Sequence, residues 1–219
     1  ATELREKICA KAAQMWDVDV ADVVFDGQYV RLSDERAARE QNRYLTLRDF
    51  ANLCVKNIAG GDALTSHASA CLPVSPPPFM AGIAEVEVDK ATGKVTVVDY
   101  AAAVDCGTVI NEALARVQAE GGIAQGIGHA LYEIVEHDGH GRLRTGNFMS
   151  YKLPTRLDIG SIRVAFEPSY EPTGPFGAKS IGEVVINTPL AAVASAVAHA
   201  TGHQVRSLPI TPEKALLGE

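Results

Sequence analysis

A ten-residue loop constrains this chain more than any other stretch. Residues 174–183, GPFGAKSIGE, contain three glycines and one proline, which favour backbone angles outside regular helices and strands. The loop carries one lysine and one glutamate among small or apolar residues, and an apolar, alanine-rich run follows it as far as Gly202. The pattern predicts a tight loop that presents the Glu183 carboxylate to a dry place and is anchored by a buried helix. The residues alone leave open whether that carboxylate is catalytic or caps the helix.

The clearest secondary-structure pattern is a β-hairpin. Apolar and polar residues alternate over 83–88 and again over 94–104, with a glycine-containing turn between them, which is the spacing of two half-buried antiparallel strands. Asp26 and Gly27 predict the turn of a shorter hairpin over 22–32. The segments 142–145 and 162–166 have the composition of further short strands.

Helical spacing of apolar residues predicts the helices that pack on these strands. The expected helices span 3–15, 46–56, 112–131 and 191–200, with a last short helix near 209–213. The charged segment 33–44 is expected to be a solvated connection, and prolines and glycines exclude regular structure from 59–82. Because hairpins and helices are interspersed, the predicted fold class is α+β, with mixed or antiparallel hairpins packed against helices.

The composition argues against several classes of function. The net charge is −7 and no basic stripe occurs in the 219 residues, so a nucleic-acid partner is not expected. The four cysteines form no CxxC motif, which argues against a structural zinc site or an iron–sulfur cluster in this chain and favours reduced thiols in a cytoplasmic protein. We expect no membrane span, since no run of 18 apolar residues occurs. The chain begins with Ala1 and has no signal-peptide pattern, so we expect a processed protein or a part of something longer.

Four motifs resemble ligand sites and are better explained without a ligand. In 177–180 an alanine separates glycine from Lys-Ser, so the P-loop pattern fails, and 122–128 fails the dinucleotide-binding pattern. The histidines of 137–140 lie in a sequence typical of an exposed hairpin tip. His129 and Glu133 have the spacing of two metal ligands on a helix, but no second motif supports them and a packed histidine is the simpler explanation. We therefore predict no metal ligands among these side chains.

Glycines interrupt the predicted helix over 112–131. Four of them occur within the eight residues 121–128, and each costs a helix about 0.5–1 kcal/mol relative to alanine. Such a cost requires a reason. One is close packing of the helix against a neighbour, and the other is close approach of a ligand to bare N–H groups at a helix start. The residues leave both open.

Several motifs in order resemble the C-terminal, molybdopterin-binding portion of the large subunit of the xanthine dehydrogenase family of molybdenum hydroxylases. The matching segments are 104–107 with 110–111, 118–122, 125–128, 151–155 and 177–183. The resemblance is strongest over 81–213 and extends more weakly to residue 1. It departs from the family at Glu112, where the family usually has a proline after the asparagine. The resemblance implies the fold of the family's second molybdopterin-binding domain, with an N-terminal α/β portion over 1–80 and the catalytic portion over 81–219.

The resemblance also implies roles for individual residues. Glu183 corresponds to the family's general base, and a carboxylate in a dry pocket suits a base that works near neutral pH. The residues that the resemblance places against the pterin and its phosphate are Gln118, Gly121, Gly122, Gln125, Gly126, Ala178, Lys179 and Ser180. Amide side chains and bare backbone groups suit such a ligand.

The implied activity is that of a molybdenum-dependent oxidoreductase. It would hydroxylate an N-heteroaromatic substrate, purine or nicotinate-like, with water-derived oxygen. The implied cofactor is molybdopterin, either as such or as its cytosine dinucleotide, and iron–sulfur clusters and FAD are expected only in partner domains or chains. We expect the chain to be incomplete as an enzyme and to need the remaining half of the large subunit. The alternatives are an aldehyde oxidase or hydroxybenzoyl-CoA reductase of the same family, and a non-catalytic scaffold.

Overall fold

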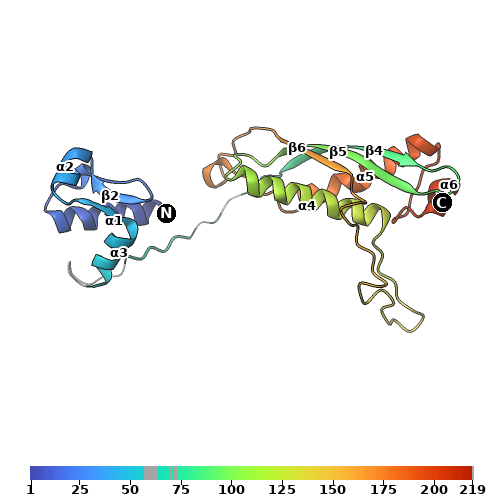
Figure 1. Cartoon of the computed structure of the whole chain (residues 1–219), viewed down its shortest axis with the longest axis horizontal. Coiled ribbons are helices and arrows are strands. Elements are labelled where there is room, and N and C mark those ends of the chain that lie inside the picture. The colour runs from blue at the N-terminus through green and yellow to red at the C-terminus, as the bar shows by residue number, and fades with distance from the viewer. Residues whose placement is uncertain (57–63, 70, 72–73, 219) are drawn as a thin grey trace. The chain divides into compact units, whose positions relative to one another are not determined.

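The chain forms two compact units in the computed structural model, which describes residues 1–56, 64–69, 71 and 74–218. Unit 1 is Ala1–Cys71 and unit 2 is Leu72–Glu219, and Figure 1 shows both, with the larger elements labelled. Each unit has its own hydrophobic core. The predicted functional division at residues 80 and 81 stays a prediction.

Unit 1 is a small antiparallel sheet with three helices. Its elements are α1 (Thr2–Trp16), η1 (Val20–Asp22), β1 (Val23–Phe25), β2 (Tyr29–Leu32), α2 (Glu35–Glu40), β3 (Tyr44–Thr46) and α3 (Leu47–Val55). The strand order is β1-β2-β3, and the core includes Ala12, Val30 and Phe50, each fully buried. The predicted first helix, the short hairpin and the helix from residue 46 are confirmed. Thr46 caps α3 by accepting a 3.1 Å hydrogen bond from the backbone N–H of Asp49.

The segment 33–44 corrects the prediction of a solvated connection, because it contains α2 and the start of β3. The Asp34 side chain caps α2 by accepting from the N–H groups of Arg36 and Ala37. Two ion pairs at helical i,i+4 spacing run along the exposed face, which supports a short helix. Ala38 is fully buried. The charges on which the prediction rested therefore mark the solvated side of a helix.

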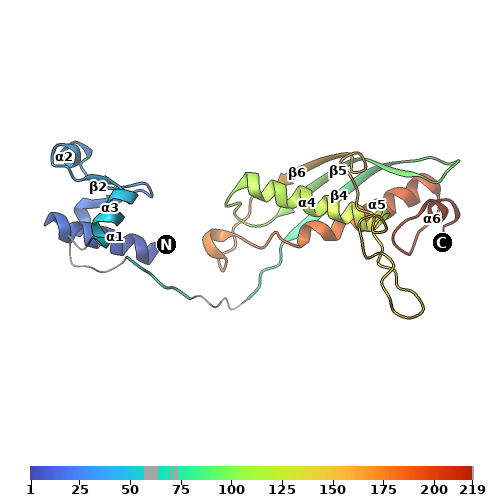
Figure 2. The same cartoon turned by 60° about the horizontal axis from the view of Figure 1, so that its bottom comes forward.

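Unit 2 is a three-stranded sheet with two long helices on one face (Figures 1 and 2). Its elements are β4 (Phe79–Val88), β5 (Val95–Asp105), α4 (Glu112–Leu131), β6 (Ser161–Phe166), η2 (Pro175–Gly177), α5 (Val184–Thr201) and α6 (Pro212–Leu217). The strand order is β4-β5-β6, with β4 antiparallel and β6 parallel to β5. The predicted long hairpin, the strand 162–166, the glycine-punctuated helix and the last short helix are confirmed, and with them the α+β fold class.

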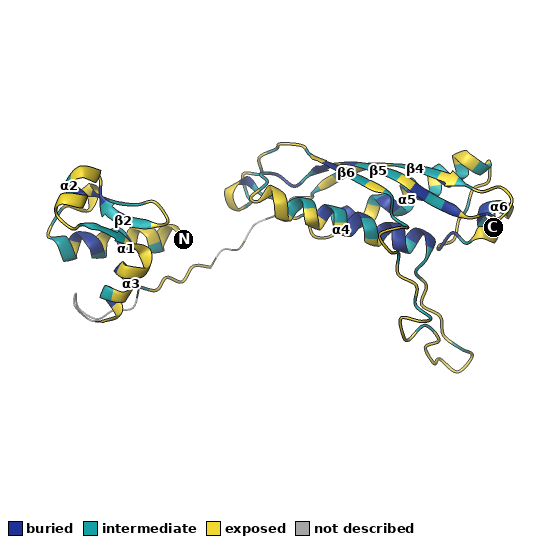
Figure 3. Cartoon of the chain, in the orientation of Figure 1, coloured by how far each residue is buried: buried dark blue, intermediate teal, exposed yellow. Residues whose placement is uncertain are grey.

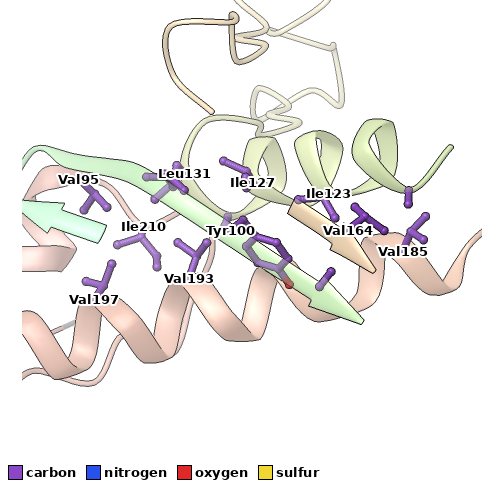
Figure 4. Close-up of a cluster of buried hydrophobic side chains, with 14 of the residues drawn as sticks. Val95, Tyr100, Ile123, Ile127, Leu131, Val164, Val185, Val193, Val197 and Ile210 are labelled. Atoms are coloured by element: carbon purple, nitrogen blue, oxygen red, sulfur yellow. The ribbon is translucent and has the colours of Figure 1, made fainter. Parts of the chain in front are cut away.

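The core of unit 2 lies between the sheet and the two helices, as Figure 4 shows. Tyr100 of β5 is fully buried, and its hydroxyl lies 2.9 Å from the hydroxyl of Thr188 on α5. Buried residues are concentrated on these elements in Figure 3. No residue of the segment 132–160, which follows α4, is buried.

Three predicted segments of unit 2 differ from the structure in their bounds or in their secondary structure. The stretch 59–82 was expected to be irregular. Its residues 59–63, 70 and 72–73 lie outside the described residues, and residues 79–82 instead begin β4, where Phe79 pairs with Asp105 at the far end of β5. The expected strand 142–145 is only an isolated bridge between His137 and Leu143. Helix α5 begins at Val184 instead of residue 191 and includes Pro189.

One helix among the described residues, α5, has the length and hydropathy to cross a membrane. This is weak support for a span, because core helices of soluble proteins pass the same test. Its buried residues Val185, Val193 and Val197 belong to the core cluster of unit 2.

Candidate functional site

The loop before α5 is fastened to the end of β5 by backbone hydrogen bonds. The N–H of Lys179 donates to the carbonyl of Cys106 at 2.7 Å, and the N–H of Thr108 donates to the carbonyl of Gly177 at 2.8 Å. Gly177 has a φ of 82°, and a Cβ there would overlap the ring of Tyr170. The glycine in this part of the loop is therefore required by the fold of the loop itself.

The Asp105 carboxylate holds the same loop through its side chains. Lys179 Nζ lies 2.5 Å from Asp105 Oδ2, while Ser169 Oγ and the Gly107 N–H donate to Oδ1 at 2.5 and 3.0 Å. The Lys179 hydrogen bond, followed by those of Ser169 and Gly107, lowers the pKa of Asp105 to about 2. The Lys179 side chain is 8% exposed, so its ammonium is engaged with Asp105 and is largely shielded from solvent.

The glycines of α4 divide between the two explanations that the sequence left open. Gly122 and Gly126 are buried against α5: a Cβ on Gly122 would overlap Val185 Cγ2, and a Cβ on Gly126 would lie 2.8 Å from Pro189 Cβ. Gly121 is exposed, with no atom within 4 Å of the position of a Cβ. Close helix packing thus explains two of these glycines, and only Gly121 faces open space.

A cleft between α4 and the start of α5 brings most of the predicted site residues together. It has a volume of roughly 410 Å3 and is lined by Val117, Gln118, Gly121, Gly122, Gln125, Gly182, Glu183 and Ile186. The two walls are joined by a hydrogen bond, in which Gln118 Nε2 donates to the carbonyl of Gly182 at 3.0 Å. These residues come from segments 64 positions apart, so the fold alone creates the cleft.

Four of the predicted residues are not in this cleft. Gly126 lies in the helix contact, and Ala178, Lys179 and Ser180 line a separate hollow of roughly 520 Å3 that also includes Gly174 and residues 74–76. The alternative of bare N–H groups at a helix start does not apply to Gly121, because this glycine lies well inside a helix that begins at Glu112. The helix start beside the cleft is that of α5, which contributes its N-cap residue Glu183 to the lining.

Glu183 is exposed in this chain, which corrects the prediction that it sits in a dry place. It occupies the N-cap position of α5, yet its side chain makes no capping hydrogen bond. The carboxylate has no hydrogen-bond or ion-pair partner within the described residues. The explanation of Glu183 as a helix cap therefore fails. Its carboxylate lines the cleft and makes no hydrogen bond or ion pair with the described residues.

The start of α4 accommodates the departure at Glu112. Asn111 caps the helix by accepting a 3.0 Å hydrogen bond from the Leu114 N–H, which makes Glu112 the first helical residue. Proline is favoured at that position by its fixed φ, and an acidic residue is favoured there by the helix dipole. Helix α4 therefore begins with a normal N-cap although Glu112 stands in place of the proline.

The motif around His129 forms a side-chain cluster away from the cleft. His129 Nε2 lies 3.7 Å from Glu133 Oε2, with the histidine side chain 38% exposed, and the Tyr151 hydroxyl donates to the same carboxylate. The expected packed histidine is thus only partly buried.

Sequence reasoning missed Asp105 as the partner of Lys179, since no local signal joins residues 74 positions apart.

Comparison with known proteins identifies relatives along the whole chain. A family model described as a molybdopterin cofactor-binding domain matches residues 1–160. The protein named "Probable hypoxanthine oxidase XdhD" of Escherichia coli (strain K12) is 35% identical over 99% of this chain and 22% of its own length. The xanthine dehydrogenase molybdenum-binding subunit of Escherichia coli O157:H7 is 32% identical over 96% of this chain and 28% of its own.

A solved structure shows the same fold. The quinoline 2-oxidoreductase from Pseudomonas putida 86 superposes with a TM-score of 0.73 at 30% identity, over 97% of this chain and 28% of that one. The chain therefore spans only about a quarter of the length of the proteins it matches.

Proposed function

Because the chain belongs to the molybdopterin-binding part of the xanthine dehydrogenase-like molybdenum oxidoreductases, we propose that its α4–α5 cleft holds part of the pterin and presents Glu183 as a general base. The observation that carries this proposal is the convergence of Gln118, Gly121 and Gln125 with Glu183 around one cleft.

The donor set of the cleft fits a pterin with a phosphate. Gln118 and Gln125 are exposed, and each amide has both a donor and an acceptor group, which suits the ring edges of a pterin. The first N–H groups of a helix have no intrahelical partner and attract anionic groups, and those of α5 begin beside Glu183. Gly121 has no side chain, and a ligand is able to approach the α4 backbone there.

When bound, the cofactor supplies the redox chemistry and the water-derived oxygen of the hydroxylation. The chain's own contribution is positional and acid–base. Gln118 and Gln125 orient the pterin, while the Gln118–Gly182 hydrogen bond fixes the distance between the two walls. The Asp105–Lys179 pair fastens the loop that ends at Glu183.

Glu183 accepts a proton on its carboxylate during the hydroxylation. No hydrogen bond or ion pair within the described residues competes for that carboxylate, so it is able to take up a proton. Proton transfer by a positioned side chain contributes typically about 10²–10⁴-fold to a rate. Exclusion of water strengthens every electrostatic interaction in such a site. The cleft is exposed in this chain, so another surface must cover it to exclude water.

The substrate that we propose is an N-heteroaromatic compound. The names of two relatives refer to hypoxanthine and quinoline, both nitrogen-containing aromatic rings. We also propose that the pterin is present as such or as its cytosine dinucleotide. The electron-transfer partners are iron–sulfur and flavin domains or subunits, in a cytoplasmic complex that includes the rest of the large subunit.

The substitution Glu183→Gln in the complete enzyme tests the general-base role. The amide keeps the size of the side chain and cannot accept the proton, so we expect turnover to fall by about 10³-fold with molybdenum content unchanged. Glu87→Gln is the matched control, because Glu87 is an exposed glutamate on β4 outside the cleft. Full turnover in Glu183→Gln would overturn the role.

A further inference from the structure

We propose that the hydrogen bond between the Tyr100 and Thr188 hydroxyls fixes the rotation of the start of α5 and thereby aims the Glu183 carboxylate into the cleft. Tyr100 and Thr188 are then positioning residues, which act on the hydroxylation through Glu183. The catalytic part of this proposal rests on the proposed general-base function. The structural part rests on the contacts of residues 184–188, the α5 start segment.

The α5 start segment is tied less firmly to its own helix than it would be in an uninterrupted helix. Pro189 follows the segment inside α5, and proline has no N–H to donate to the carbonyl four residues earlier, which here belongs to Val185. Glu183 moves with the segment, because its carbonyl accepts a 3.2 Å hydrogen bond from the Ile186 N–H. The direction of Glu183 therefore depends on what holds the segment from outside the helix.

Two neighbouring elements hold the α5 start segment. On the α4 side, Val185 packs where Gly122 has no side chain. On the sheet side, the Tyr100 hydroxyl of β5 lies 2.9 Å from Thr188 Oγ1. Within the described residues, this is the one side-chain hydrogen bond between the sheet and α5. Apolar packing is non-directional, whereas a hydrogen bond has a preferred distance and angle. The hydroxyl pair is therefore the contact that fixes rotation about the helix axis.

The fold leaves room for the hydroxyl pair at the meeting point of β4, β5 and α5. Tyr100 is fully buried in the core that Figure 4 shows. On β4, a Cβ at Gly82 would overlap the Tyr100 hydroxyl and lie 3.0 Å from Thr188 Oγ1. A buried hydroxyl needs a hydrogen-bond partner. Rotation of the α5 start segment away from the sheet leaves the Tyr100 hydroxyl without one, so the core opposes that rotation.

Rotation at Thr188 is transmitted to the cleft. Successive residues of an α-helix are about 100° apart around its axis, so Ile186 and Thr188 point in nearly opposite directions. Ile186 and Glu183 line the cleft, while Thr188 contacts Tyr100. A rotation of about 10° moves atoms at the outer helix radius, about 5–6 Å, by about 1 Å. A misplacement of about 1 Å is able to cost about 100-fold in rate.

Kinetics of the complete enzyme test the positioning role. Tyr100→Phe and Thr188→Val each remove one hydroxyl of the pair, whereas Thr188→Ser keeps it. We expect kcat to fall about 10–100-fold in the first two variants and to stay within about 3-fold of wild type in Thr188→Ser. KM and molybdenum content should not change. Tyr151→Phe is the matched control, because it removes the hydroxyl that donates to Glu133, away from the cleft.

Combination with Glu183→Gln separates positioning from a general loss of structure. Because Tyr100 acts through Glu183, Tyr100→Phe should not slow an enzyme that already carries Glu183→Gln. Losses that multiply in the double variant would overturn the positioning role. An equal fall of kcat in Tyr100→Phe and Tyr151→Phe would also overturn it, since the effect would then belong to any buried tyrosine hydroxyl.

Hydrogen exchange followed by mass spectrometry provides a readout that needs no activity. In the full chain, we expect peptides over 184–192 to exchange about 5-fold faster in Tyr100→Phe than in wild type. Peptides over 193–201, in the second half of α5, should keep their rates. Unchanged exchange over 184–192, or an equal change along all of α5, contradicts the anchoring of the α5 start segment by the hydroxyl pair.

Failure of this proposal is distinguishable from failure of the general base. Lost turnover in Glu183→Gln with wild-type turnover in Tyr100→Phe and Thr188→Val keeps the base and overturns the positioning role. Full turnover in Glu183→Gln removes the base and with it the catalytic part of the proposal. The exchange rates over 184–192 then still decide whether the hydroxyl pair anchors the α5 start segment.

Discussion

Asp105 and Lys179 lie 74 positions apart in the sequence and meet where β5 ends. Their side chains are 21% and 8% exposed, so the pair is largely shielded from water. Ser169 and the Gly107 N–H donate to the second carboxylate oxygen of Asp105, and these hydrogen bonds further stabilise the negative charge of Asp105. Such a satisfied cluster orients the loop before Glu183, and removal of one member leaves the others buried without a partner.

Replacement of Asp105 by asparagine should therefore cost stability. We expect Asp105→Asn to lower the free energy of unfolding of unit 2 by about 2–4 kcal/mol, because it leaves the Lys179 ammonium buried and unpaired. Urea unfolding followed by circular dichroism measures the change. Glu112→Gln removes the exposed pair with Arg116 and should change stability by less than about 1 kcal/mol. Equal effects of the two substitutions would contradict a special role for the Asp105 cluster.

The same carboxylate predicts a pH dependence. The Lys179, Ser169 and Gly107 hydrogen bonds lower the folded pKa of Asp105 from 3.8 to about 2. A lowered pKa means that the stabilisation is fully present above the unfolded pKa and is lost as the pH falls from about 4 towards 2. We expect the stability difference between wild type and Asp105→Asn to shrink over this range in urea unfolding. A difference that stays constant between pH 6 and pH 2 would contradict the assignment.

At the scale of elements, the contact between α4 and α5 shapes the cleft. Gly122 and Gly126 allow the two helices to approach, because Val185 and Pro189 occupy the space of their missing side chains. Gly121, one residue away, points to the open cleft. Adjacent glycines on one helix thus serve different purposes, one in packing and one in leaving a ligand surface bare.

Alanine substitutions distinguish these two glycines. Gly122→Ala should destabilise unit 2 by about 1–3 kcal/mol, because the added methyl overlaps Val185 in a packed contact. Gly121→Ala meets no atom within 4 Å and should stabilise the helix by about 0.5–1 kcal/mol. Thermal and urea unfolding of the two variants provide the measurement. The packing explanation fails if Gly122→Ala is as stable as Gly121→Ala.

At the scale of the whole molecule, the two units have separate cores. The cluster around Phe50 belongs to unit 1 and the cluster around Tyr100 belongs to unit 2, with no residue in common. All lining residues of the Glu183 cleft belong to unit 2. The cleft therefore depends on one core only.

Independent cores predict independent unfolding. Residues 74–219 alone should give a cooperative urea transition and keep the far-UV circular dichroism of their helices, since unit 2 has a core of its own. In the full chain, Phe50→Ala should lower the stability of unit 1 by about 3–5 kcal/mol and leave the transition of unit 2 in place. A fragment 74–219 without a cooperative transition would show that unit 2 needs unit 1 to fold.

The sequence by itself determined most of the local elements and the family. Period-two alternation predicted the long hairpin, and apolar spacing predicted α4, because both signals lie within one element. The family motifs singled out Glu183, Gln118 and Gln125 as candidate site residues without any structure. The short helix α2 was missed because its capping residue and its buried Ala38 are less conspicuous than the charges around them.

Only the tertiary structure decided what the loop 174–183 and the glycines of α4 do. Burial and pairing depend on residues that are distant in sequence, such as Asp105 for Lys179 and Val185 for Gly122. No pattern within a single segment encodes those distances. The fold therefore assigned Lys179 to anchoring the loop, assigned Gly122 to helix packing, and left Glu183 exposed beside Gln118, at the edge of a cleft.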